Sequence, residues 1–460
     1  MQKLLSIVDL KKYFPVRKKR LFQKQKAYLR AADGISIEIR KGEAYGLVGE
    51  SGCGKSTLGR TVLQLYKPTD GRVFYYGRTL EDCSPRYVGE YLKKARRIRT
   101  ECLKNGRLSE EGKRLCEIFG GLFLAKSEIF EESLSLLTEK HDLLFSKNFT
   151  STQTRYADFL KKAEAIQARL QTLKTLAQEE IFFEECEKYA ERGIDLTHLT
   201  AGELRACRRD LQIIFQDPYS SLDPRMTVGQ IIEEGVVTHR FFKRGSAEMQ
   251  AYVLKIMKRC GLQEYMLHRY PHQFSGGQRQ RICIARALSL QPKFIVCDEC
   301  VSALDVSIQS QILNLLADLK EEEGLTYLFI SHDLSVVRYV SDRIGVMYLG
   351  NIIEQGNSEE VFSNPRHPYT IALISAIPSM NEGERQEKEG KRILLKGNMP
   401  SPVSPPCGCK FHTRCFMAQE KCQRIPPPVV DVGNGHLVAC HFADKPTEEK
   451  RKIALRKEEE

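Results

Sequence analysis

The most constraining feature of this 460-residue chain is a glycine-rich segment that joins an apolar run to a helical pattern. The run AYGLVG, residues 44–49, is apolar throughout, as a strand buried on both faces of a parallel sheet requires. Its last glycine opens the sequence GESGCGKST, residues 49–57, which fits the pattern G-x-x-x-x-G-K-S/T. Glycines let successive backbone N–H groups turn toward one centre, where they bind a phosphate group. The segment therefore predicts an α/β fold with a phosphate-binding loop at the end of a strand.

We expect this loop to hold the phosphates of a nucleotide. Its members are Gly49, Glu50, Ser51, Gly52, Cys53, Gly54, Lys55, Ser56 and Thr57. The Lys55 ammonium is expected to reach the β- and γ-phosphates, and the Ser56 hydroxyl to bind Mg²⁺. Thr57 is expected at the α-phosphate, whereas Cys53 occupies a variable position of the loop and need not be reactive.

Two further apolar runs deliver polar side chains to the same edge of the predicted sheet. The run FIVC, residues 294–297, leads to Asp298 and Glu299, and the run TYLFI, residues 326–330, leads to His332. Ligands bind beyond the carboxyl ends of such strands in open α/β folds. We expect Asp298 to hold Mg²⁺ through water and Glu299 to orient or deprotonate the attacking water.

Residues 83–198 differ from the rest, because they contain no buried-strand pattern and carry 20 basic and 19 acidic side chains. Two runs of apolar positions step by three and four residues, as in paired helices. They are Phe130, Leu134, Leu137, His141 and Leu144, and then Phe159, Ala163, Ile166, Leu170, Leu173 and Ala177. We therefore predict a coiled-coil-like helical hairpin inserted in a nucleotide-binding α/β domain made of residues 1–82 and 199–380.

A Pro- and Cys-rich module is predicted at residues 381–446, followed by a charged tail at 447–460. Five of the fifteen cysteines fall within residues 407–440. Cys409, Cys415, Cys422 and Cys440 have the spacing C-x5-C-x6-C-x17-C, and four thiolates suit an iron–sulfur cluster or zinc. Cys407 is the spare thiol. Because a small Pro-rich module has little core, we expect a structural role for the bound metal.

The composition excludes several classes of protein. The net charge is +12, but no aromatic-interleaved basic motif indicates a nucleic-acid partner. No run of ~18 apolar residues predicts a helix that crosses a bilayer, and the N-terminus lacks the features of a secretory signal. We expect a protein in the cytoplasm or at the cytoplasmic face of a membrane, held there by partners.

The segment FSGGQ, residues 274–278, lies between the phosphate loop and Asp298 and resembles the LSGGQ signature of ABC-type ATPases. Other family elements follow the family's order. Gln216, in IIFQDP, is similar to the Q-loop glutamine, SALD at residues 302–305 to the D-loop, and His332 to the switch histidine. The resemblance implies a RecA-like parallel sheet with antiparallel β and helical signature subdomains.

Several longer segments resemble the ATPase subunits of oligopeptide/dipeptide importers, the Opp/Dpp group. They are RYPHQFSGGQ, FQDPYSSLDPRMTVG, NPRHPYTIAL and PPCGCKFHTRCFMAQEKC. The resemblance implies a second, different ATPase subunit, two membrane-spanning permease subunits and an extracytoplasmic binding protein. It also implies a 4Fe–4S cluster at the four cysteines, with zinc as the alternative.

The same resemblance assigns further residues to the ATP site. Two ATPase subunits are expected to enclose ATP between the phosphate loop of one and Ser275, Gly276, Gly277 and Gln278 of the other. Gln216 is expected to bind Mg²⁺ and to couple the site to the permease. Adenine stacking is expected on Tyr28, with Phe22 as the alternative. One departure is Cys300, where the family has proline after Asp-Glu, which predicts a less rigid turn.

Two alternative functions remain at this point. The Opp/Dpp group includes nickel and glutathione importers, so the transported solute is open. Similar ATP-binding heads with inserted coiled coils also occur in DNA-linked ATPases. Residues 83–198 are far too short for a long coiled-coil arm, and the C-terminal elements have no role in that class.

Overall fold

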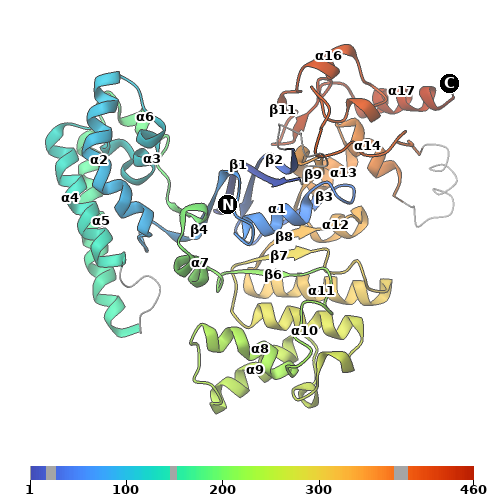
Figure 1. Ribbon diagram of the computed structural model, residues 1–460, viewed down its shortest axis with the longest axis horizontal. Helices are drawn as coiled ribbons and strands as arrows, with labels where there is room; N and C mark the ends of the chain where they lie inside the picture. The colour runs from blue at the N-terminus through green and yellow to red at the C-terminus, as the bar shows by residue number, and fades with distance from the viewer. Residues whose placement is uncertain (1, 17–26, 146–152, 378–391, 460) are drawn as a thin grey trace, which may run out of the picture. The chain divides into compact units, whose positions relative to one another are not determined.

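The computed structural model describes residues 2–16, 27–145, 153–377 and 392–459 (Figure 1). They form two compact units, one of residues 1–72 with 209–460 and one of residues 73–208. In the described ranges no helix has the length and apolar content that crossing a membrane requires. Phe22 and the predicted boundary at residues 380–381 lie outside the described residues.

The first unit is built on an eight-stranded sheet with the order β11-β12-β10-β9-β3-β8-β7-β6. Its strands are β3 (Ala44–Val48), β6 (Leu211–Ile214), β7 (Phe294–Asp298), β8 (Thr326–Ile330), β9 (Arg343–Tyr348), β10 (Asn351–Asn357), β11 (Val429–Asp431) and β12 (Leu437–Ala439). Strands β9, β3, β8, β7 and β6 are parallel, and β10, β12 and β11 continue the sheet antiparallel. The three apolar runs expected to be buried strands are β3, β7 and β8, and every residue in them is buried.

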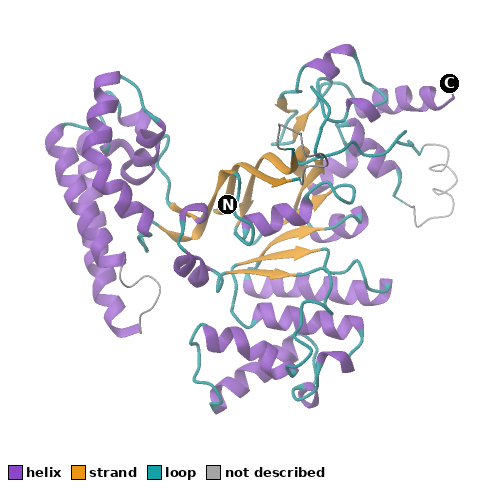
Figure 2. Cartoon of the chain, viewed as in Figure 1, coloured by secondary structure: helices purple, strands orange, loops and turns teal. Residues whose placement is uncertain are grey.

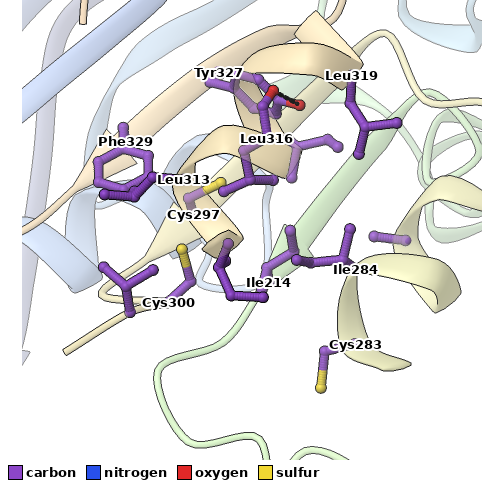
Figure 3. Packing of buried hydrophobic residues seen from close by; sticks show 14 of the residues in the cluster. Ile214, Cys283, Ile284, Cys297, Cys300, Leu313, Leu316, Leu319, Tyr327 and Phe329 are labelled. Atoms are coloured by element: carbon purple, nitrogen blue, oxygen red, sulfur yellow. Dashed lines mark hydrogen bonds between the residues drawn. The ribbon is translucent and has the colours of Figure 1, made fainter. Parts of the chain in front are cut away.

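Successive side chains of a strand point to opposite faces of the sheet. Helices cover both of these faces. On one face, helix α1 (Lys55–Val62) packs closely enough that a Cβ on Gly59 would meet Ile330 and Val296. On the other, Cys297 and Phe329 join a core with helix α11 (Val306–Glu323), as Figure 3 shows. The buried strands are therefore apolar except at two strand ends, Thr326 of β8 and Asp298 of β7.

The remaining elements of the first unit surround this sheet (Figure 2). Strands β1 (Lys3–Pro15) and β2 (Tyr28–Arg40) form an antiparallel pair. The other helices are α8 (Val228–Thr238), α9 (Ala247–Arg259), α10 (Gly276–Leu288), α12 (Leu334–Val340), α13 (Ser358–Ser363), α14 (Pro368–Ser375), α16 (Glu420–Arg424) and α17 (Thr447–Glu459). Helices α8, α9 and α10 pack together and precede β7 in the chain.

The C-terminal residues are more closely tied to the sheet than we expected from the sequence. Strand β12 pairs with β10, so part of the predicted Cys-rich module extends the central sheet. Residues 447–459, expected as a charged tail, form helix α17. The Lys450 ammonium donates a hydrogen bond of 2.6 Å to the Arg366 carbonyl, and the Thr447 hydroxyl donates one of 2.6 Å to the Pro365 carbonyl. These contacts hold the helix against the segment before α14.

The second unit is helical except for an antiparallel pair between β4 (Asp70–Thr79), which begins in the first unit, and β5 (Gly193–Asp195). Its helices are α2 (Arg86–Asn105), α3 (Glu110–Phe119), α4 (Ser127–Phe145), α5 (Gln153–Ala177), α6 (Phe183–Glu187) and α7 (Ala201–Cys207), with a 3₁₀ turn η1 (Gly120–Leu122). The predicted hairpin corresponds to α4 and α5, which contact each other. Helices α2, α3 and α6 pack against that hairpin and bury its apolar faces in one shared core.

The two seams of the hairpin are largely buried. In α4 the buried seam residues are Phe130, Leu134 and Leu144, and in α5 they are Ala163, Ile166, Leu170, Leu173 and Ala177. The side chain of Phe159 lies outside the described part. The compact unit begins and ends about ten residues beyond the predicted insertion at 83–198, since β4, β5 and α7 pack with the helices.

Candidate nucleotide site

The glycines of the phosphate loop allow two close backbone approaches. A Cβ on Gly49 would lie 2.2 Å from the Met347 carbonyl oxygen, and one on Gly54 would lie 1.9 Å from that of Ala31. Gly54 also has a φ of 110°, in the left-handed region, immediately before α1 begins at Lys55. Only glycine fits at both positions, which explains why the motif has glycine at residues 49 and 54.

The Lys55 side chain is buried inside the loop that it follows. Its ammonium donates hydrogen bonds of 2.7 Å to the Gly49 carbonyl and 3.1 Å to the Glu50 carbonyl. Cys53 is buried beside it, and burial raises the pKa of the Cys53 thiol. The loop thus holds a positive charge at its centre, which would attract the negatively charged phosphates of a nucleotide.

Asp298 lies at the end of β7 and is 1% exposed. Its Oδ2 accepts a hydrogen bond of 3.2 Å from the guanidinium of Arg60, on α1. Its Oδ1 is buried and has no hydrogen-bond partner among the described residues. A buried carboxylate oxygen without a partner is costly, and a Mg²⁺ ion with its waters would satisfy it. Asp298 and the Ser56 hydroxyl are therefore suited to hold Mg²⁺.

Three residues predicted to be catalytic meet at the Glu299 carboxylate. The Gln216 amide donates to Glu299 Oε2 at 2.9 Å, and His332 Nδ1 lies 3.3 Å from the same oxygen. Glu299 has a φ of 50°, and its side chain is 12% exposed, while that of His332 is 54% exposed. Positive φ is costly for a non-glycine residue and is found at functional sites. The arrangement places a carboxylate with two polar neighbours where an attacking water can reach it.

Cys300 takes a packing role in place of proline. It is 2% exposed and lies in the core beside Cys297, whose thiol pKa is raised by hydrogen bonding with Cys300 and by burial (Figure 3). The Ser302 N–H and hydroxyl donate to the Glu299 carbonyl at 3.2 and 2.9 Å. These bonds hold the turn after Glu299, and the lower rigidity expected from Cys300 stays a prediction.

The signature residues begin helix α10. Ser275 is its N-cap and accepts a hydrogen bond of 3.4 Å from the Gln278 N–H, while the Gln278 side chain accepts one of 3.1 Å from the Ser275 N–H. A Cβ on Gly277 would lie 2.4 Å from Ile308 of α11, so glycine permits close packing. Between residues 275–278 and 49–57, both fully described, no hydrogen bond or ion pair forms within one chain.

The sequence matches the ABC transporter family over residues 32–178 and 170–302. It also matches the family described as "Oligopeptide/dipeptide transporter, C-terminal region" over residues 353–422. It is 37% identical over 440 residues to the oligopeptide transport ATP-binding protein AppF of Bacillus subtilis, covering 95% of this chain and 97% of that protein. This chain belongs to the oligopeptide/dipeptide family of ABC transporter ATP-binding subunits.

A second relative agrees with this assignment. The chain is 36% identical over 444 residues to the dipeptide transport ATP-binding protein DppF of Escherichia coli, covering 96% of each protein. A solved ATP-binding cassette, described as dimeric and bound to ADP and phosphate, is 20% identical with a TM-score of 0.46, covering 77% of this chain and 99% of that one. The family membership makes the chain an ABC transporter ATPase and sets aside the DNA-linked alternative.

Sequence reasoning missed the contacts that this ABC ATPase makes between its C-terminal part and the phosphate loop. The Glu50 N–H donates to the Tyr369 hydroxyl at 2.9 Å, and Arg414 donates to the Glu50 carboxylate at 2.9 Å. Lys410 donates to Asp33 at 2.7 Å. These partners are more than 300 residues apart in the chain, so no local pattern could have identified them.

Tyr28, expected to stack on adenine, is the first residue of β2. It pairs with Pro15 of β1 and is 42% exposed. An exposed aromatic ring at a strand end is available for stacking, but nothing in the structure tests that role, and it stays a prediction.

The four C-terminal cysteines lie in one small cluster with Met417, Val438 and Phe442. Burial raises the pKa of Cys409 to about 11 and that of Cys415 to about 12, with neighbouring thiols adding to each rise. The Met417 N–H donates to the Cys415 sulfur at 3.4 Å, and the Phe442 N–H to the Cys440 sulfur at 3.4 Å. Within the described ranges, however, no three His, Cys, Asp or Glu side chains form a group able to hold a metal ion. The donor chemistry suits a cluster, and the cluster itself stays a prediction.

Proposed function

We propose that this chain hydrolyses ATP to power the import of oligopeptides or dipeptides through a membrane transporter. The observation that carries the proposal is the contact of both Gln216 and His332 with the Glu299 carboxylate, next to Asp298. Glu299 would orient the attacking water and take its proton, while Lys55 would bind the transferred phosphate. The relatives named as peptide transport proteins support the solute class.

Turnover would require two ATPase subunits. We infer that a second, different ATPase subunit contributes its signature residues to the phosphate loop of this chain, and that Ser275–Gln278 serve the other site in return. The start of α10 offers free N–H groups to a γ-phosphate.

The remaining partners would be two membrane-spanning permeases and an extracytoplasmic peptide-binding protein. The chain would then lie at the cytoplasmic face of the membrane as a peripheral subunit. Gln216 would also sense Mg²⁺ and transmit the state of the site to the permease. Tyr28 would stack on adenine, and Tyr28→Ala would weaken ATP binding several-fold.

Reconstitution of the complete transporter in vesicles tests this function. A labelled dipeptide and a labelled hexapeptide are offered with ATP and Mg²⁺, and Ni²⁺ and glutathione are offered as competing solutes. We expect uptake of peptide by the wild-type complex and none with Lys55→Ala in this subunit. Uptake of Ni²⁺ or glutathione without peptide would overturn the assignment of peptides as the solute, but it would not affect the assignment of ATPase activity.

We also propose that Cys409, Cys415, Cys422 and Cys440 hold a 4Fe–4S cluster, with zinc as the alternative. Four thiols in one small cluster and N–H groups donating to two of the sulfurs support this ligand set. The cluster would close a segment with little core of its own. It has no assigned part in ATP hydrolysis.

Anaerobic purification and metal analysis test the cluster. We expect about four irons per chain and a brown colour, both lost in Cys422→Ser. Cys407→Ser is the matched control, because Cys407 is exposed while Cys422 is buried. A colourless protein that contains zinc would be consistent with the four cysteine ligands but would exclude the iron–sulfur cluster. A metal-free wild-type protein would exclude both iron and zinc at these cysteines.

A further inference from the structure

The second unit contains a cavity of about 280 Å³ that has no part in the ATP site. It lies at the base of the helices, between α4, α5 and the two segments by which the chain enters and leaves them. Residues 80–84 and 190–192 belong to those segments, and the Leu80 N–H donates to the Arg192 carbonyl at 2.8 Å.

The wall of this cavity combines apolar and polar side chains. The apolar contribution comes from Val88, Phe119, Leu122, Leu137 and Leu170. The polar contribution is at least as large and comes from Glu81, Ser84, Glu117, Lys140, His141, Gln167, Gln171, Lys174, Glu187 and Arg192. Apolar and polar groups thus share the wall about equally, so the cavity can accept a ligand that has both an apolar body and a charged group.

Lys140 is the unusual member of the lining. The residue is 5% exposed, and its ammonium donates a hydrogen bond of 2.8 Å to the Gln167 side-chain oxygen. Among the described residues it forms no ion pair with a carboxylate, whereas Lys174, which also lines the cavity, pairs with Glu187 at 2.7 Å. Burial lowers the pKa of Lys140, since the charged form loses its hydration. A buried ammonium whose single partner is a neutral amide is costly for the fold.

We propose that this cavity binds a small organic carboxylate with an apolar body, and that the carboxylate group pairs with Lys140. The ligand's negative charge would supply a carboxylate at hydrogen-bond distance, whereas Glu81 and Asp82 act on the Lys140 ammonium only over a longer range and offset part of the pKa decrease. One unpaired ammonium matches a single negative charge better than a phosphate, which carries more. The Gln171 amide is a second donor to the same group, and the apolar wall would accept a body of about the size of a benzyl group or a short acyl chain.

The site is tested with the full chain and two carboxylates, 3-phenylpropionate and octanoate, each compared with its neutral amide. Calorimetric titration and thermal unfolding measure binding. We expect each acid to bind the wild-type chain about tenfold or more tightly than its amide, because the amide cannot form a charge-assisted hydrogen bond. Lys140→Met should remove this preference.

The matched control is Lys161→Met, which removes a lysine that is exposed on α5. This variant should keep the preference for the acids. Without a ligand, Lys140→Met should unfold at the same temperature as the wild type or higher, because a buried charge has been removed. If Lys140→Met does not fold, Lys140→Gln replaces it. Equal binding of acid and amide, a preference that survives in the Lys140 variant, or no binding of either acid at millimolar concentration would overturn the proposal.

Discussion

The guanidinium of Arg414 donates to the carboxylate of Glu50 at 2.9 Å, which joins the Cys-rich segment to the phosphate loop. The Arg414 side chain is 8% exposed and that of Glu50 is 28% exposed. Arg414 also lies over the ring of Tyr348, whose ring packs edge-on against Tyr369. Because Tyr369 accepts a hydrogen bond from the Glu50 N–H, both the side chain and the backbone of Glu50 are held by residues from the C-terminal part.

A double-mutant cycle with Arg414→Met and Glu50→Gln should reveal this coupling. We expect a coupling energy of about 1–2 kcal/mol in chemical unfolding, because the pair is mostly buried and its members contact directly. Arg414→Met alone should also weaken ATP binding several-fold, since it frees one side of the loop. Arg424 and Glu420 form an exposed pair that serves as the control, with an expected coupling below about 0.5 kcal/mol. A coupling as small as that of the control would mean that the contact does not support the loop.

Glu299→Gln should block ATP hydrolysis in the assembled transporter while leaving ATP binding near the wild-type level. The amide keeps the shape of the side chain but cannot take a proton, so we expect a rate lower by about 10²–10⁴-fold. Turnover and equilibrium ATP binding are measured on the same preparations. Lys55→Ala is the contrasting variant, since it should weaken binding itself. Near-normal hydrolysis by Glu299→Gln would exclude Glu299 as the catalytic carboxylate.

Removing the helices of the second unit should leave an ATP-binding protein if the cut follows the backbone pairing. Leu80 and Arg192 are hydrogen-bonded neighbours, so a short Gly-Ser linker between them can replace residues 81–191. The wider cut from Asp82 to Leu199, which the sequence alone suggested, removes β5 with the buried Ile194 and Leu196. We expect the wider deletion to be less stable than the narrower one by about 3–6 kcal/mol.

Chemical unfolding and ATP binding of both deletion variants check this expectation. If the narrower variant aggregates or binds no ATP, the helices are part of the core of the ATP-binding domain. If it binds and hydrolyses ATP but transport fails in cells, the helices serve a partner or a regulator.

His367 should make stability depend on pH in the mildly acidic range. Burial lowers its pKa to about 4, from about 6.5 in the unfolded chain. The folded state then binds fewer protons than the unfolded state between these values, so the contribution is complete above about pH 6.5 and is lost as the pH falls toward 4. The expected slope from this one group is at most about 1.4 kcal/mol per pH unit.

The measurement compares the wild type with His367→Asn from pH 7.5 to 4.5. Asparagine can keep the cap of α14, in which His367 accepts a hydrogen bond from the Tyr369 N–H. The stability advantage of the wild type should shrink as the pH falls. His268→Asn, at an exposed position, serves as the control.

The residues of the ATP site were predictable from sequence because each follows a buried strand or begins a helix. Asp298 ends the strand β7, Glu299 follows it, and Gly54 precedes α1, so short-range patterns were enough to identify them as candidates. The local sequence pattern did not show which of these residues contact one another. The contact of Gln216 with Glu299 spans 83 positions and depends on where the loop after β6 leaves the sheet.

The hairpin seams show the limit of periodicity. The step of three and four residues identified the buried faces of α4 and α5. It could not show that α2, α3 and α6 pack on the same core, or that Lys140 is buried at the base. A lysine in a charged helical sequence is expected in solvent, and only the surrounding helices remove it from water.

The sequence by itself determined the parallel-sheet core, the phosphate loop and the carboxylates at the ends of strands, because burial on both faces and tight turns restrict the residue types that fit. Tertiary structure alone decided that β12 joins the central sheet and that Arg414 and Tyr369 hold Glu50. These contacts join segments more than 80 residues apart, and in the case of Glu50 more than 300. Their formation depends on the relative placement of elements after packing, which no local propensity or spacing specifies.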